Sequence, residues 1–120
     1  MVVTQPQRLA GVEAMKAATM FTELDVPVLG VVENMSGAFG RGGGRAVAES
    51  LRVPLLGAVD FDEQMVTEGD AGTPAVVARP LSAAATSYMG IARRVAAALG
   101  WAYVDDAAAH AIGAAPEPVA

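Results

Sequence analysis

Apolar residues along the chain fall into two kinds of pattern. Short continuous runs occupy residues 2–4, 28–32 and 54–59, as in parallel strands that are buried on both faces. Between and after these runs, apolar positions recur with a helical period over residues 7–24, 45–51 and 82–99. Strands that alternate with helices through short connections predict an α/β fold with a parallel sheet.

The predicted helices have recognisable starts and stops. The first follows Pro6 and ends before residues 25–27, and the second begins at Arg45 after a glycine-rich loop that we expect to be flexible. The last is expected to start at the N-cap Ser82, to stop at Gly100 and to pack its apolar stripe against the sheet. The inward stripe expected for the first helix is Leu9, Val12, Met15 or Lys16, Thr19, Met20, Phe21 and Leu24.

The segment between the third run and the last helix is rich in turn-forming residues. We expect a loop from residue 60 that passes into one helical turn at residues 64–66. Turns are expected over residues 68–74, which contain two glycines and a proline, and a short extended segment over residues 75–78.

The three predicted strands make a thin sheet for a doubly wound fold. At 120 residues the chain holds at most one domain. Its pattern is that of a partial doubly wound parallel sheet over residues 1–100, resembling the second half of a larger domain. Residues 101–120 are rich in alanine and proline, and we expect this tail to be disordered.

Composition excludes several classes of function. The formal net charge of −5 argues against a nucleic-acid groove and against a polybasic membrane anchor. No apolar run reaches the roughly 18 residues of a membrane span, and the N-terminus lacks the basic region of a signal peptide. We therefore expect a cytoplasmic protein without a nucleic-acid or membrane partner.

Few residues are available for metal or nucleophilic chemistry. The sequence has no cysteine, which excludes disulfides and thiolate metal ligands. The single histidine, His110, lies in the alanine-rich tail and is expected to be a solvated residue. We therefore predict no metal site.

The strongest candidate residue is Asn34, which follows the apolar run at residues 28–32. Ligands of open α/β sheets bind at the carboxyl ends of strands, and an asparagine amide offers both a donor and an acceptor. The alternative is an asparagine that only caps the turn after the strand. The residue alone leaves both interpretations open.

Acidic residues follow the third strand at Asp60, Asp62 and Glu63. They are compatible with paired carboxylates for acid–base catalysis or with a Mg²⁺ site. A solvated loop in which one aspartate caps a helix is the interpretation that we favour.

The glycine-rich loop at residues 40–44 is not a Walker A loop. That motif requires a Gly-Lys pair whose lysine reaches the phosphates, and the only lysine is Lys16, inside the first predicted helix. We expect a connector. Arg41 and Arg45 are expected to be solvated at the surface, and the alternative is that they contact an acidic partner.

Five segments together resemble the C-terminal half of Mrp-type P-loop ATPases, iron–sulfur cluster carriers of the MinD/ParA-like group. The segments are residues 2–7, 26–36, 39–44, 53–57 and 68–74, and the resemblance covers about residues 1–99 in order. The most specific parts are Glu-Asn-Met-Ser after a buried strand and the later Gly-Asp-Ala-Gly-Thr-Pro segment.

The resemblance implies an ATP-binding role with an incomplete site. It assigns Asn34 to the edge of adenine, and Asp60 and Asp62 to the second loop beside the base. The chain departs from the family because Val66 replaces the usual arginine and because the Cys-x-x-Cys pair that bridges the cluster is missing. Iron–sulfur ligation by this chain is therefore doubtful.

The expected function is that of the adenine-side half of an ATP-binding iron–sulfur cluster carrier. Without a Walker A lysine, the chain alone is expected not to hydrolyse ATP. By resemblance, its partners are a second copy or a complementing P-loop half, together with iron–sulfur client proteins. The alternatives are a non-enzymatic interaction module that pairs through its open sheet edge, and a decayed fragment that does not fold stably.

Overall fold

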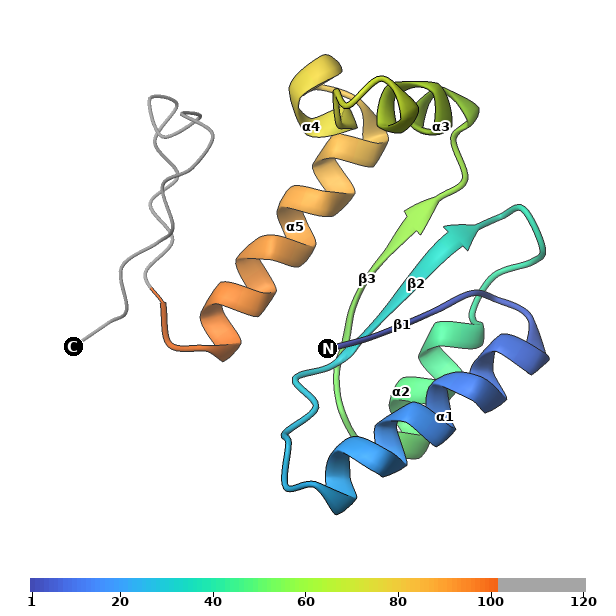
Figure 1. Cartoon of the computed structure of the whole chain (residues 1–120), viewed down its shortest axis with the longest axis vertical. Helices are drawn as coiled ribbons and strands as arrows, with labels where there is room; N and C mark the ends of the chain where they lie inside the picture. Colours follow the sequence, from blue (N-terminus) through green and yellow to red (C-terminus); the bar gives the residue numbers. More distant parts are fainter. Residues whose placement is uncertain (102–120) are drawn as a thin grey trace.

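The computed structural model describes residues 1–101 of the chain as three strands and five helices. The expectations for the tail beyond Trp101, including His110, lie outside the described residues. Figure 1 shows the three strands between α5 on one side and α1 and α2 on the other. The elements are β1 (Val2–Thr4), α1 (Arg8–Glu23), β2 (Val31–Ser36), α2 (Gly43–Leu51), β3 (Leu55–Asp60), α3 (Glu63–Asp70), α4 (Ala75–Ala78) and α5 (Ala83–Ala98).

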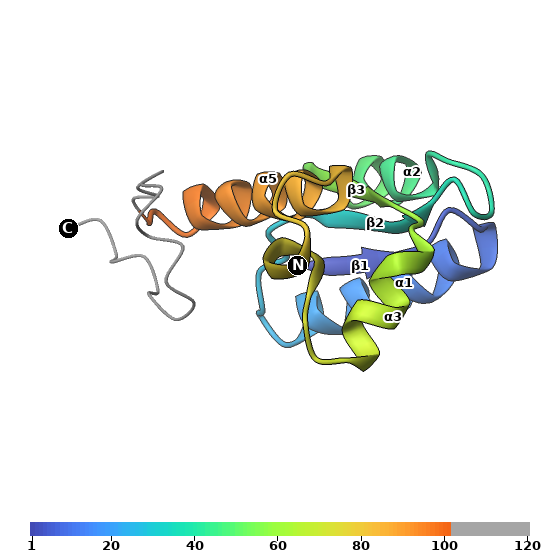
Figure 2. The same cartoon turned by 90° about the horizontal axis from the view of Figure 1, so that it is seen from above.

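The strands form one parallel sheet in the order β1-β2-β3. Figure 2 shows them side by side in that order, with β1 at the border. β1 pairs with β2 in regular register, from Val2 opposite Val31 to Thr4 opposite Glu33. The predicted α/β fold with a partial parallel sheet is confirmed.

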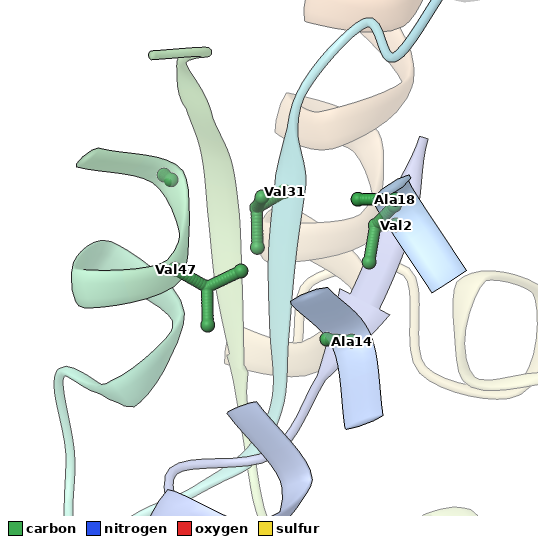
Figure 3. Packing of buried hydrophobic residues seen from close by; sticks show 6 residues of the cluster. Val2, Ala14, Ala18, Val31 and Val47 are labelled. Atoms are coloured by element: carbon green, nitrogen blue, oxygen red, sulfur yellow. The ribbon is translucent and has the colours of Figure 1, made fainter. Parts of the chain in front are cut away.

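Two successive residues of β2 point into two different cores. Val31 is fully buried in a cluster with Val2 of β1, Ala14 and Ala18 of α1, and Val47 of α2 (Figure 3). On the other face, the side chain of the next residue packs with β3 and α5, in a cluster of Val32, Leu56, Val59 and Ile91. Because side chains alternate along a strand, helices cover both faces, as in a doubly wound fold. The expected packing of the last helix against the sheet is confirmed.

The inward face of α1 differs from the prediction. Of the predicted stripe, Met15 and Phe21 pack against the core, whereas Leu9, Val12, Met20 and Leu24 are exposed. The fully buried positions of the helix are Ala14 and Ala18. Small side chains face the sheet because α1 packs closely against both β1 and α2. The periodic pattern identified the helix but only part of its buried face, because apolar residues occur on more than one side of it.

β2 also lies further along the chain than predicted. The strand covers Val31–Ser36 rather than residues 28–32, so that Glu33 and Asn34 are part of it. A buried carboxylate in a strand is costly unless hydrogen bonds compensate it. Here the glycine loop supplies those hydrogen bonds to Glu33, as described below.

The segment between β3 and α5 is more helical than predicted. α3 extends over two turns, to Asp70, through residues that were expected to form turns, and residues 75–78 form the helical turn α4 rather than an extended segment. α4 follows Pro74, whose φ of −62° is already suitable for a helix start and whose carbonyl accepts from Val77 and Ala78. Ser82 caps α5 as predicted, accepting from the Ala85 N–H at 3.1 Å. Within residues 1–101, each helix is too short or too polar to cross a bilayer.

Candidate functional site

Asn34 lies near the carboxyl end of β2, within an irregular part of the strand. The register with β3 shifts between Glu33 and Ser36, and Met35 has a positive φ of 55°. Such a bulge changes the direction of the side chains around it. Asn34 is half-buried and lines an open groove of about 550 Å³ that runs beside β1 and α1. The other polar residues that line this groove are Thr4, Gln5 and Glu13.

The residue before it, Glu33, anchors the glycine loop. Its side chain is buried, with 2% of the residue exposed. One carboxylate oxygen accepts from the Gly44 N–H at 2.7 Å and from the Gly42 N–H at 3.0 Å. The other accepts from the Ser36 hydroxyl at 2.7 Å. The start of α2 is thereby fixed to β2.

These contacts set the charge state of Glu33. Burial raises the pKa of its carboxyl, but hydrogen bonds from Gly44, Ser36 and Gly42 and the charge of Arg41 together outweigh this effect. The pKa therefore lies below its ordinary value of 4.5, and the group is an anion at neutral pH. The first turn of α2 has no acidic residue of its own, so Glu33 supplies the negative charge that favours a helix N-terminus.

The glycine loop is therefore not an open phosphate cradle. The N–H groups of Gly42 and Gly44 that could bind a phosphate already donate to Glu33. The second helix begins at Gly43, two residues before the predicted start. The loop expected to be a flexible connector is bound at three points, through Arg41, Gly42 and Gly44.

Arg41 was expected to be solvated at the surface, and it forms an ion pair. Its guanidinium donates to both oxygens of Asp60, at 2.5 and 3.3 Å, and also to the Ser36 hydroxyl at 3.2 Å. The hydrogen bond from Arg41 lowers the pKa of Asp60. Both side chains remain largely exposed, so the pair adds little free energy of folding but connects the loop to the end of β3.

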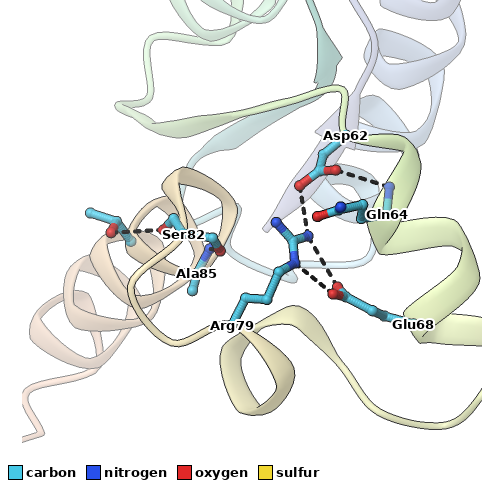
Figure 4. Close-up of polar contacts among 7 residues, drawn as sticks. Asp62, Gln64, Glu68, Arg79, Ser82 and Ala85 are labelled. Atoms are coloured by element: carbon cyan, nitrogen blue, oxygen red, sulfur yellow. Dashed lines mark hydrogen bonds and ion pairs between the residues drawn. The ribbon is translucent and has the colours of Figure 1, made fainter.

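Asp62 belongs to a different network, shown in Figure 4. One of its oxygens accepts from the Gln64 N–H at 2.9 Å and caps α3, and the other pairs with Arg79 at 2.7 Å. Arg79 also bonds Glu68 at 2.5 and 3.1 Å. The favoured interpretation of a helix-capping aspartate is confirmed for Asp62, whose pKa the hydrogen bond from Arg79 lowers.

Replacing Arg79 tests whether this network holds α3 and α4 together. We expect Arg79→Met to leave the carboxylates of Asp62 and Glu68 close together without a counter-charge, and so to loosen α3 and α4 while α5 and the sheet stay folded. Amide hydrogen exchange should show faster exchange confined to residues 62–79. Equal loss of protection in β2 and β3 would contradict a local role.

The structure does not bring the three candidate residues into one site. Asn34 lines the groove beside β1, Asp60 pairs with Arg41, and Asp62 pairs with Arg79. All three lie close to the carboxyl edge of the sheet, where the end of β2 at Ser36 is opposite the end of β3 at Asp60. In the described part of the chain, no group of three histidine, cysteine or acidic residues has the arrangement of a metal site.

The residue that the sequence analysis missed is Glu33. From the sequence, Glu33 is placed only in the Glu-Asn-Met-Ser motif after the strand and is assigned no partner. The available signal was an acidic residue directly after a buried run and before a glycine loop that opens a helix, because helix N-termini bind anions.

A family model for the ParA family, described as NUBPL iron-transfer P-loop NTPase, matches residues 1–96. The iron–sulfur cluster carrier protein of Deinococcus radiodurans is 42% identical over 106 residues, which cover 79% of this chain and 30% of the relative. The carrier protein of Escherichia coli is 40% identical over 111 residues, which cover 83% and 30%. The chain thus spans about a third of the length of the curated relatives that it matches.

Solved structures show the same fold. The septum site-determining protein MinD of Pyrococcus horikoshii, in complex with Mg-ADP, matches 78% of this chain and 40% of its own, with a TM-score of 0.67 and 23% identity. The resemblance drawn from the five sequence segments is therefore confirmed by family, relatives and fold. The chain belongs to the ParA family of NUBPL-type iron-transfer P-loop NTPases.

Proposed function

We propose that this chain forms the adenine-side wall of the ATP site of an iron–sulfur cluster carrier, and that it acts in the cytoplasm. The phosphate-binding wall comes from polypeptide outside these 120 residues. The observation that carries the proposal is Asn34, which is half-buried at the carboxyl edge of a parallel sheet and lines an open groove. This is the edge at which α/β sheets bind ligands.

The chemistry of Asn34 fits an adenine edge. Its amide presents a donor and an acceptor side by side, which matches the adjacent amino group and ring nitrogen of adenine. No hydrogen bond within the described residues engages the Asn34 side chain, so the amide is available to a ligand. Asp60 and Asp62 are held by arginines nearby, and we assign them to shaping the second loop beside the base.

The residues of this chain do not fit the phosphates of ATP. The Gly42 and Gly44 N–H groups of the loop already donate to the carboxylate of Glu33. The negative charge of this carboxylate would repel a phosphate at the same position. The sequence contains no Gly-Lys pair. Binding of the triphosphate, and hydrolysis, therefore require a second segment that supplies a lysine and a free loop.

Iron–sulfur clusters are cargo that this chain does not ligate by itself. Cluster ligation uses thiolates, and the sequence has no cysteine. If the assembled carrier transfers clusters, the thiolates come from a partner half, a second subunit or the client protein.

The test is nucleotide binding by a chimera. The part of the Deinococcus radiodurans carrier that precedes the matched segment is joined to this chain, and ATP and GTP affinities are measured by titration calorimetry. We expect Asn34→Ala to weaken ATP binding about tenfold, as expected for the loss of one or two hydrogen bonds at a site shielded from water. The same variant should lose most of the preference for ATP over GTP.

Gln64→Ala serves as the control, since its exposed amide side chain lies on α3 and away from the groove. It should leave both affinities unchanged. If Asn34→Ala and Gln64→Ala both bind ATP like the parent chimera, Asn34 does not contact the base and the proposal fails.

A further inference from the structure

The outward face of α1 carries large apolar side chains that are exposed to solvent. The inward face is made of Ala14 and Ala18, which point to the core around Val31 (Figure 3). On the outward face, Leu9 is 74% exposed and Met20 is 50% exposed. A helix face in water usually carries polar side chains. Large apolar side chains that share such a face indicate an interaction surface.

Four residues form a continuous row along this outward face. Leu9, Glu13, Lys16 and Met20 follow one another at intervals of four, three and four residues, so they lie on one side of the helix. This is the spacing by which two helices pack against each other in a coiled coil. The row is apolar at both ends and charged in the middle, and we call it the α1 seam.

The α1 seam is complementary to itself in one orientation. In an antiparallel pair centred between Glu13 and Lys16, these two residues lie opposite Lys16 and Glu13 of the second copy. Leu9 then lies opposite Met20 of the second copy, and both contacts repeat because a two-fold interface presents the same patch twice. In a parallel pair in register, each charge would face its own kind, which is unfavourable. Charge complementarity therefore selects the antiparallel pair.

We propose that two copies of this chain associate through antiparallel pairing of their α1 helices along the α1 seam. The inference does not depend on the proposed nucleotide site, because the seam is centred on the middle of α1 and not at the carboxyl edge of the sheet. Four residues from each copy are far fewer than the roughly 20–30 per partner of a standard interface. The dimer is therefore weak and forms only at high protein concentration.

The charged centre of the seam sets the orientation of the pair, and the apolar ends supply its affinity. Lys16 donates to Glu13 of its own helix at 2.9 Å, and both side chains are largely exposed. An exposed ion pair of this kind contributes little free energy, but a charged pair within an apolar seam fixes the register of two helices. Leu9 and Met20 gain most from the contact, because each loses exposed apolar surface.

The first experiment measures the self-association of the full 120-residue chain by sedimentation equilibrium, from micromolar to millimolar protein. Leu9→Gln and Met20→Gln remove the apolar contacts. Each should weaken the dimer at least about tenfold, because every substitution acts twice in a symmetric interface. The matched control is Leu81→Gln, which lies between α4 and α5 and is 96% exposed. It should associate like the parent chain.

A charge swap tests the orientation. Glu13→Lys gives the seam two positive charges, and Lys16→Glu gives it two negative charges. Each variant alone should self-associate at least about tenfold more weakly than the parent, whereas an equimolar mixture of the two should form a mixed dimer. The double variant Glu13→Lys with Lys16→Glu keeps the complementarity and should dimerise like the parent. Misfolding cannot produce this pattern, because two weakened variants restore each other.

The outcomes are separate from those of the nucleotide titrations. A dimer that both single charge variants weaken and that the double variant restores supports the pairing, whether or not Asn34→Ala affects ATP binding. A chain that stays monomeric at millimolar concentration overturns the inference. A dimer that is indifferent to Leu9→Gln, Met20→Gln and the charge variants also overturns it, because its contact then lies elsewhere, as at the open edge of β1. Circular dichroism confirms that each variant is folded.

Discussion

Glu33→Gln should destabilise the fold by about 3 kcal/mol, because breaking a buried, hydrogen-bonded charge is among the costliest single changes. The carboxylate accepts from the Gly42 and Gly44 N–H groups and from Ser36. A glutamine has one acceptor oxygen, so its NH2 group would face either the Gly42 and Gly44 N–H groups or the Ser36 hydroxyl, which now donates to Glu33. Urea unfolding followed by circular dichroism measures the loss. The control is Glu49→Gln, an exposed glutamate on α2, which should change the free energy of unfolding by less than about 0.5 kcal/mol.

The same variant should show a defined pH dependence. The pKa of Glu33 is lower in the folded protein than its ordinary value of 4.5. Its contribution to stability is therefore fully present above pH 4.5 and is lost as the pH falls through the folded-state pKa. The stability difference between wild type and Glu33→Gln should shrink on acidification below pH 4.5. A difference that stays constant down to pH 3 would contradict the role assigned to the charge.

Gly43→Ala should be the second severe change, with a loss of about 3 kcal/mol or more. A Cβ at this position would overlap the carbonyl oxygen of Pro6 and lie 2.7 Å from its carbonyl carbon. Both groups are backbone, so neither can move without shifting α1 or α2. Because these two helix starts meet at the carboxyl edge of the sheet, the clash would displace the glycine loop from Glu33. Thermal unfolding should show a lower Tm.

A second glycine gives the opposite expectation and serves as the control. Gly69 lies in α3 with nothing within 4 Å of its added Cβ. Gly69→Ala should raise stability by about 0.5 kcal/mol, because alanine has the higher helix propensity and reduces the entropy of the unfolded chain. A Gly43→Ala variant as stable as Gly69→Ala would contradict the close contact between Gly43, at the start of α2, and the Pro6 backbone before α1.

The elements that could be predicted from the sequence are those with one dominant local signal. The parallel strands follow from continuous apolar runs, and α5 follows from a serine N-cap, a stripe of apolar residues and a glycine stop. The face of α1 could not be predicted, since Leu9 and Val12 are as apolar as any core residue and yet are exposed. Close packing on the sheet selected the alanines instead.

The polar residues of the candidate site could likewise be predicted from the sequence only in part. Asn34 stood out because it follows a buried run, but the position of Glu33 within β2 depends on amides eleven and nine residues further along the chain. Arg41 and Asp60 are paired across nineteen residues. Such contacts between distant residues carry no periodic signal. The glycine loop gave a local signal for the partners of Glu33, but the pairing of Arg41 with Asp60 is revealed only by the fold.

The central claim is that these 120 residues supply one wall of a nucleotide site and require another. Phosphate release from ATP, measured for the purified chain alone and for the chimera that contains the upstream part of the Deinococcus radiodurans carrier, tests it most directly. The account predicts release by the chimera and none above background for the chain alone. ATP hydrolysis by the chain alone, lost on Asn34→Ala, would contradict it.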